Sequence, residues 1–216
     1  MAELGIHDLS VFIVSGLLLN IAPGPDSLLI MTRSATQGWR AGCAAAWGIG
    51  AGTLVHVSAA ALGLSALLVA SATAFTVVKI VGAAYLCYLG VQMLMSRRHG
   101  EREAGASAAP TPALPYRRIF AQGFLTNVLN PKVALFFLAF VPQFIAADSQ
   151  HKALAFALLG LLFDANSMLW CNFLAVFAAF AGARVNASAA IARWLNRGIG
   201  ALFLALGVRL ALSERG

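Results

Sequence analysis

An aspartate and a lysine each follow a proline inside an apolar segment, and these are the residues with the clearest chemical meaning. Asp26 follows Pro-Gly-Pro, and Lys132 follows Asn-Pro. A carboxylate can hold an ammonium group or carry a proton, and an ammonium group can hold a carboxylate. Where apolar segments span a membrane, ionised side chains are costly and usually functional. The pair therefore predicts a site for a small molecule that carries both charges.

Each of the two residues also has a structural explanation. Asp26 would lie in the first turn of a helix that restarts at Pro25, where an acid interacts favourably with the helix dipole. A lysine in the same place opposes the dipole, so local stability does not explain Lys132. We expect Lys132 to have an anionic partner, which is Asp26, Asp164 or a bound carboxylate. A cap at Asp26 and a static ion pair at Lys132 are the structural alternatives.

The prolines themselves indicate where the binding site lies. Pro23 and Pro131 lie 108 residues apart, each within an apolar segment. Proline removes a backbone donor and clashes with the preceding turn, so the helices must unwind. Paired breaks at corresponding positions are typical of transporters built from two repeats, with the site at the breaks. The predicted substrate-binding residues are Asn20, Pro23, Gly24, Pro25, Asp26, Asn127, Asn130, Pro131 and Lys132.

Other polar residues in apolar segments are candidates for moving protons. Asp164 is a second acid within such a segment. His56 is its counterpart in the first half, because the two residues are separated by the same 108 positions as the two prolines. A histidine titrates near neutral pH, although a lone one in a membrane helix is often a hydrogen-bonded packing residue. The proton-coupling candidates are therefore Asp26, Asp164 and His56. The asparagines near the breaks also have an alternative role, because asparagine caps helices and pairs with unwound backbone.

Composition places the chain among membrane proteins. Hydrophobic residues make up 60% of it and charged residues 11%, and the mean hydropathy is +0.82. A soluble domain carries about a quarter charged residues, and a spanning helix needs about 20 mainly apolar residues. We predict an all-α membrane protein with six transmembrane helices, although Arg197 and Arg209 near the ends of the sixth span leave five possible. The six spans are 8–32, 41–68, 73–95, 118–145, 153–181 and 195–212.

One segment divides the chain into two halves. Residues 96–117 are charged at both ends and rich in Ala, Pro and Ser, which is typical of a flexible linker. The flanking parts, 1–95 and 118–216, hold three predicted spans each, so they must cross the bilayer in opposite directions. Gly52 matches Gly160 at the 108-residue offset, and Gly-rich stretches of spans 3 and 6 also match. We therefore predict two inverted three-helix repeats, with spans 1 and 4 broken at the proline motifs.

The basic excess is explained by topology. The chain has fifteen Lys and Arg against eight Asp and Glu, and ten of the basic residues fall between spans 1 and 2, 3 and 4, or 5 and 6. The positive-inside rule places these loops and the 96–117 linker in the cytoplasm and both termini in the periplasm. No nucleic-acid partner is then needed. The first segment is expected to be a retained span, because its leading residues carry Glu3 and Asp8 and no basic residue.

The sequence contains little that suggests an enzyme. It has no nucleophile elbow, HExxH helix or nucleotide-binding loop, and Cys43, Cys87 and Cys171 stand apart without CxxC spacing. We predict no catalytic residue, cofactor or metal site. A metal-cation exporter and, less favoured, a membrane thiol-redox protein are the alternatives. A small-residue face with Gly42, Gly48, Gly50 and Gly52 is typical of close helix packing, and a homodimer is its alternative use.

Two stretches carry a family resemblance. IAPGPDSLLIMTRSATQGWRAG (21–42) and GFLTNVLNPKVALFFLAFVPQF (123–144) resemble the LysE/RhtB family of bacterial amino-acid exporters, as do GAAYLCYLG and GALFLALGVRL in spans 3 and 6. The resemblance implies efflux of threonine, homoserine or other neutral or basic amino acids across the bacterial inner membrane, driven by the proton gradient. It carries over to residues 23–26 and 130–132. His56 and Asp164 rest on residue chemistry alone.

Physical chemistry and resemblance together predict one mechanism. The amino ends of the half-helices and Lys132 suit the carboxylate of an amino acid. Asp26, the unwound carbonyls and the asparagines suit its ammonium group. Rocking of one repeat against the other would expose the site to each side in turn, and a proton on Asp26 or Asp164 would release the substrate.

Overall fold

The computed structural model describes residues 2–64, 72–95, 113–146 and 148–181, together with residues 197, 198, 201, 204, 205, 207 and 208. Every element in these ranges is a helix, and the one extended pairing among them is a single bridge between Ile6 and Ile145. This agrees with the predicted all-α class. The α-helices are α1 (Leu9–Ile21), α2 (Pro25–Gln37), α3 (Trp39–Ala59), α5 (Ala72–Met95), α7 (Tyr116–Val128), α8 (Pro131–Leu135) and α9 (Lys152–Ala181).

Shorter helical segments extend two of these helices, and another lies at the start of the chain. A π-helix, η2 (Ala60–Leu64), continues α3, and a second π-helix, η3 (Phe136–Phe140), continues α8. A 3-10 helix, η4 (Val141–Phe144), follows η3, and another, η1 (Ala2–Leu4), opens the chain.

Long apolar helices in the described ranges are able to cross a bilayer. Two of them qualify singly, Trp39–Gly63 and Lys152–Phe180, and the number rises to four if each of two bent helix pairs is one span. The outward side chains are apolar, with Leu129, Leu169 and Phe180 about three-quarters exposed (76%, 76% and 77%). Such an exterior is suited to lipid. The structure describes seven residues of the predicted span 195–212, and all seven are helical.

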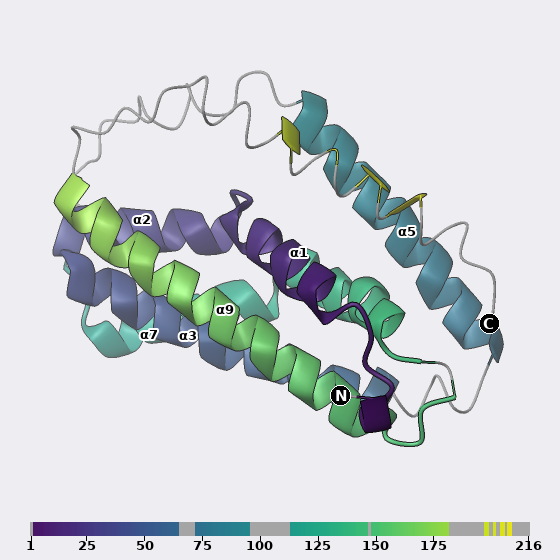
Figure 1. Ribbon diagram of the computed structural model, residues 1–216. Coiled ribbons are helices and arrows are strands. Elements are labelled where there is room, and N and C mark those ends of the chain that lie inside the picture. The colour runs from purple at the N-terminus through teal and green to yellow at the C-terminus, as the bar shows by residue number, and fades with distance from the viewer. Residues whose placement is uncertain are drawn as a thin grey trace.

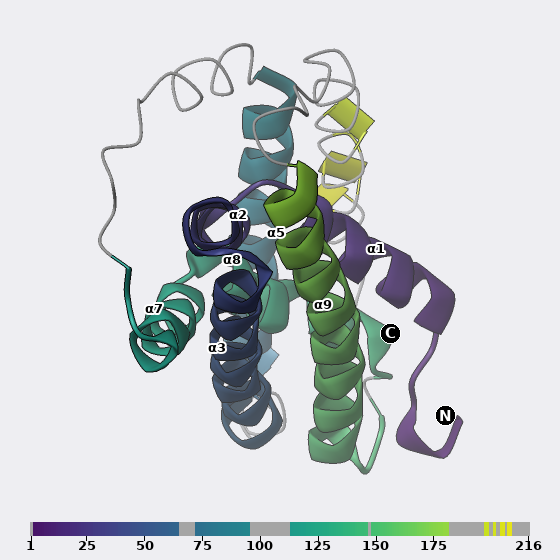
Figure 2. The same ribbon diagram turned by 90° about the vertical axis from the view of Figure 1, so that its left-hand side faces the viewer.

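Helix α3 lies at the centre of the bundle. It packs against α2, α7 and α9, and Figure 2 shows it between α7 and α9. Helix α1 packs against α9, whereas α5 lies to one side and contacts the bundle at η3 (Figure 1).

Both bent pairs bend where a proline begins the second helix. The axes of α1 and α2 differ by 54°, and those of α7 and the segment Pro131–Phe144 by 45°. Pro25 and Pro131 each hold a first-turn position, where a missing N–H costs nothing. Gly24 precedes the first of them in an extended conformation, and the Asn130 side chain caps the second by accepting from the Lys132 amide.

Two hydrophobic clusters hold the bundle together. The larger is rich in phenylalanine, and Phe136 lies at its centre with ring centroids 4.6 Å from Phe163 and 5.0 Å from Phe140. Aromatic pairs at such distances contribute beyond their buried area. The smaller cluster joins α2, α3, α7 and α9 through small side chains and isoleucines, which are Ile30, Ala41, Ala45, Ala46, Ile49, Ile119, Cys171 and Ala175.

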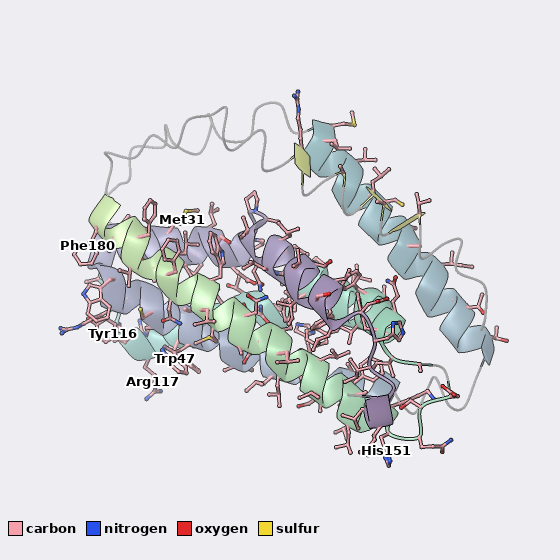
Figure 3. All side chains as sticks on the ribbon, viewed as in Figure 1. Met31, Trp47, Tyr116, Arg117, His151 and Phe180 are labelled. Carbon is pink, nitrogen blue, oxygen red and sulfur yellow. The ribbon has the colours of Figure 1, made fainter. Side chains whose placement is uncertain are left out.

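The two ends of the bundle differ in character. Phe180, Tyr116 and Arg117 gather at one end, and His151 lies at the other (Figure 3). At the first end the guanidinium of Arg33 donates to Gln122 Oε1 (2.9 Å) and the side-chain amide of Gln37 donates to the carbonyl of Leu114 (3.0 Å), so the end of α2 and the start of α7 are close together. The amino-terminal segment is at the second end, where the amide of His7 donates to the carbonyl of Phe144 (3.1 Å). The end of α2 and the start of α7 therefore lie at the end of the bundle opposite the amino-terminal segment.

The small-residue face of α3 packs inside the chain. A Cβ on Gly48 would collide with the carbonyl oxygen of Phe120, and one on Gly123 with the carbonyl of Ala45, so α3 and α7 are in backbone contact. Gly42, Gly50 and Gly52 likewise face neighbours on α2, α9 and α7. Internal packing accounts for the whole face, and a homodimer would have to use a different surface.

Substituting Gly48 by alanine should destabilise the bundle. The new methyl group meets main-chain atoms, which no side-chain rotation can move, and overpacking of this kind costs about 1–3 kcal/mol. We expect the thermal midpoint of the purified protein to fall by about 3–10 °C. Gly63→Ala is the matched control, because among the described residues beyond its own stretch of helix no atom lies within 4 Å of a Cβ built at Gly63. Equal midpoints for the two variants would show that α3 and α7 are not in such close contact.

Candidate functional site

The two helix breaks face each other, and a side chain from each break contacts the other break. Asp26, in the first turn of α2, accepts hydrogen bonds from residues at the end of α7 and just beyond it. Lys132, in the first turn of α8, donates to main-chain carbonyls at the end of α1. Each break therefore supplies a charged side chain to the other, and both charges lie between the two halves of the sequence.

Asp26 has one satisfied oxygen and one unsatisfied oxygen. Its Oδ2 accepts from Asn127 Nδ2 (3.0 Å) and from Asn130 Nδ2 (3.1 Å). Its Oδ1 is buried and has no hydrogen-bond partner, and the same is true of Asn20 Nδ2. A buried acceptor and a buried donor thus remain unpaired in the same region. Leaving such groups unpaired costs about 1–3 kcal/mol each, so they favour a site that a polar ligand completes.

Lys132 is held by main-chain oxygens rather than by a carboxylate. Its Nζ donates to the carbonyls of Leu19 and Ala22, both at 3.1 Å. No ion pair within 4.0 Å joins it to Asp26. Neither Asp26 nor Asp164 is therefore the ion-pair partner of Lys132, and of the three partners we expected a bound carboxylate stays a prediction. The physical reason for the carbonyl contacts is that the last carbonyls of a helix lack intrahelical donors and carry partial negative charge, which a cation can satisfy.

The prolines explain why two main-chain carbonyls near the breaks, those of Leu19 and Asn127, lack their helical donors. In an unbroken helix the Leu19 carbonyl would accept from the N–H of residue 23, but Pro23 has none. In the second half Pro131 stands in the same relation to the Asn127 carbonyl. That carbonyl accepts instead from Asn130 N (2.9 Å) and from His56 Nε2 (3.1 Å).

Asn127 connects the site to α3. It is 1% exposed, and its amide donates to Asp26 while its Oδ1 accepts from the Thr53 hydroxyl (3.3 Å). Because a carbonyl can only accept, His56 must carry its proton on Nε2 in order to bond the Asn127 carbonyl. The His56 ring stacks on Phe137 of η3, with centroids 6.2 Å apart. This network fixes the direction in which the Asn127 amide points.

A small cavity of about 20 Å³ lies between the breaks. That volume holds about one water molecule. Four of the predicted site residues line it: Asn20, Asp26, Asn127 and Lys132. The remaining lining residues are Leu19, Ser27, Thr53, Val133, Phe163, Ser167 and Cys171.

The other predicted residues have different positions. The prolines and Gly24 form the breaks, and Asn130 is both the cap of α8 and a partner of Asp26. His56 reaches the site only through Asn127. Asp164 does not line this cavity; its Oδ1 is buried without a hydrogen-bond partner and lies near Gly50 of α3, 3.5 Å from where a Cβ would be. The structure therefore does not bring the three proton candidates together.

Sequence analysis missed several contributors to the site. Thr53 lies three residues before His56, on the same face of α3, and this helical spacing was an available signal. Ser167 and Cys171 are one turn apart on α9, 3.8 Å between Oγ and Sγ. The three cysteines are free thiols, and among the described residues no group of three His, Cys, Asp or Glu side chains is placed to hold a metal ion.

The fold and the site define a multi-pass membrane protein with opposite charges held at two helix breaks. The chain belongs to the LysE type translocator family, whose model matches residues 17–214. The family resemblance found in the sequence is therefore confirmed.

Similar proteins cover nearly the whole chain. An uncharacterized membrane protein of Pseudomonas aeruginosa is 34% identical over 215 residues, which is 98% of each chain. Leucine efflux proteins of Salmonella typhimurium and Klebsiella pneumoniae are each 28% identical, over 210 and 213 residues, with 97% of each chain covered. No solved structure matches the chain. Membership of the family supports amino-acid export as the general function.

Proposed function

We propose that this protein exports a neutral amino acid from the cytoplasm in exchange for protons. The observation that carries the proposal is the pair of unsatisfied buried groups, Asp26 Oδ1 and Asn20 Nδ2, on residues that line one cavity. An amino acid offers an ammonium group to the carboxylate oxygen and a carboxylate to the amide. Asp26 is also held in place by two asparagine amides, so its free oxygen is positioned in advance.

The lining favours a neutral, aliphatic side chain. Leu19, Val133 and Phe163 supply apolar surface, and two relatives are named leucine efflux proteins. Asp26 is the one acidic residue among the described lining residues, and the substrate's own ammonium group uses it. A lysine or arginine substrate would bury a second cation without an acidic partner, which is costly. Threonine and homoserine come second to leucine, because Ser27 and Thr53 also line the cavity and offer hydroxyl partners.

The breaks support an inverted repeat and alternating access. Each half contains a bent helix pair followed by a long helix, and the charge of each half contacts the break of the other. A cavity with room for about one water must enlarge before an amino acid can enter. We infer that the halves rock about the breaks, as spans 1 and 4 of a six-span inner-membrane carrier. The basic loops then face the cytoplasm and both termini the periplasm.

Proton coupling is assigned to the acids and His56. Asp26 must release the ammonium group to complete the cycle, and its protonation would do so. Asp164 is a second unsatisfied carboxylate on the neighbouring helix α9. His56 bonds the main chain of Asn127, whose amide holds Asp26, so a change at the ring can reach the site.

Transport into inverted membrane vesicles tests the proposal. With an acid-inside pH gradient we expect labelled leucine to accumulate, threonine and homoserine to accumulate less, and lysine and arginine not at all. A protonophore should abolish accumulation. Uptake of lysine in place of leucine, or uptake that ignores the gradient, would contradict the substrate class or the coupling.

The same vesicles separate the two alternatives. Uptake of a divalent cation such as Mn²⁺ in place of amino acids would support the metal-cation exporter. Loss of all transport on replacing Cys43, Cys87 and Cys171 by alanine would support a thiol-redox role. We expect neither result.

A further inference from the structure

We propose that the carbonyls of Leu19 and Ala22 form the subsite for the substrate's ammonium group, and that the ammonium of Lys132 is a tethered occupant that leaves when substrate binds. This inference rests on the proposed function. It assigns a role to main-chain atoms. Lys132 first competes with the substrate's ammonium group for the two carbonyls, and it then pairs with the substrate's carboxylate.

The carbonyl pair has the properties of an ammonium site. Both oxygens belong to the end of α1, where the helix dipole places partial negative charge. Pro23 leaves the Leu19 carbonyl without its helical donor. In the structure each oxygen lies 3.1 Å from Lys132 Nζ, a normal distance for a hydrogen bond from an ammonium group. The subsite therefore already binds the functional group that every α-amino acid carries.

A third acceptor for that group lines the same cavity. The oxygen Asp26 Oδ1 has no partner, and Lys132 does not reach Asp26 within 4.0 Å while it is bound to the carbonyls. An ammonium group has three N–H donors. A substrate ammonium unattached to α8 can use the carbonyl pair and also turn toward Asp26.

A substrate carboxylate offers Lys132 a stronger hydrogen-bond partner than the two carbonyls do. Hydrogen bonds from an ammonium group to a carboxylate are stronger than those to a neutral carbonyl. The main chain of Lys132 is fixed, because its amide donates to Asn130 Oδ1 (3.0 Å), so only the four-carbon side chain has to move. One cation then replaces another on the carbonyls, and the displaced one pairs with the carboxylate. Only a molecule that has both groups drives this exchange.

The exchange can be tested with leucine and with leucine that lacks its carboxylate. The second probe is 3-methylbutylammonium, which has the ammonium group and the side chain but nothing to draw Lys132 away. We expect purified wild-type protein to bind leucine and to bind the amine at least about tenfold more weakly. In Lys132→Ala the carbonyls have no resident cation. This variant should bind the amine at least about tenfold more tightly than the wild type does, and should lose affinity for leucine.

Matched variants keep the test decisive. Lys132→Arg retains a cation and should exclude the amine as the wild type does. Lys132→Met preserves side-chain bulk without charge, and it replaces the alanine variant if that protein does not fold; it should bind the amine. Equal binding of the amine to wild-type, Lys132→Ala and Lys132→Met proteins, or its binding to none of them, would overturn the inference. Failure of the wild type to bind any amino acid would instead overturn the proposed function.

Discussion

Asp26→Asn should strongly reduce leucine binding and export while leaving the protein folded. Asparagine has the same shape as aspartate, and its carbonyl oxygen can keep accepting from Asn127 and Asn130. What changes is the second oxygen, the unpartnered acceptor Oδ1, which becomes an amide donor. A donor cannot bind an ammonium group, and a hydrogen bond to a charged group contributes about 1.5–3 kcal/mol. We expect leucine affinity to fall by about tenfold or more.

The measurement is leucine counterflow in proteoliposomes, together with the thermal midpoint of the same preparation. Counterflow needs no net driving force, so a lower rate reports the site itself rather than the coupling. Asp148→Asn is the matched control, because it makes the same chemical change at an exposed position in the loop before α9. Parental counterflow in Asp26→Asn would remove Asp26 from the binding site and would leave the unpaired oxygen without a function.

The charged part of the site was predictable from the sequence because its chemistry is expressed in side chains. Asp26 and Lys132 are ionisable residues that follow prolines in apolar segments, a pattern visible in the sequence, and both line the cavity. The partner of Lys132 was not predictable in the same way, because every residue has a carbonyl. The position of Pro23, four residues after Leu19, held the information, since a proline withdraws the donor from the carbonyl one turn earlier.

Uncharged lining residues were harder to recognise. Thr53, Ser167 and Cys171 are small residues of a kind common in membrane helices, where they usually serve packing. Only the fold shows that they surround the cavity. Most of the predicted span 195–212 and most of the 96–117 linker lie outside the described residues, and the inverted repeat stays a prediction.

In each half of the sequence a proline leaves a main-chain carbonyl without its helical donor, but the two carbonyls bind different side chains. In the first half, proline frees a carbonyl that binds the cation of Lys132. In the second half, Pro131 frees the Asn127 carbonyl, which accepts a hydrogen bond from the ring nitrogen Nε2 of His56. Pro131 also begins α8, a task that Pro25 performs for α2. One proline of the second half therefore does the work of two in the first. The asymmetry gives the first break its cation-binding character and couples the second break to α3.

Asn127→Leu should impair transport and stability together. Leucine fits the fully buried position but removes the donor to Asp26 and the acceptor for Thr53. Each buried group left without its partner costs about 1–3 kcal/mol. The thermal midpoint should therefore fall by about 5–10 °C. Counterflow should fall by about tenfold or more, because Asp26 loses one of the two amides that position it.

Two further variants serve as comparisons for Asn127→Leu. Asn172→Leu makes the same change at a residue whose amide bonds the carbonyl of Met168 in its own helix, so export should be retained. Thr53→Val removes only the hydroxyl and leaves the contact of Asn127 with Asp26, so its effect should lie between those of the two asparagine variants. This order follows if α3 acts on the site through Asn127. If Thr53→Val reduced counterflow more than Asn127→Leu, Thr53 would act on the substrate directly, and the cavity wall on α3 would belong to the binding site rather than to its support.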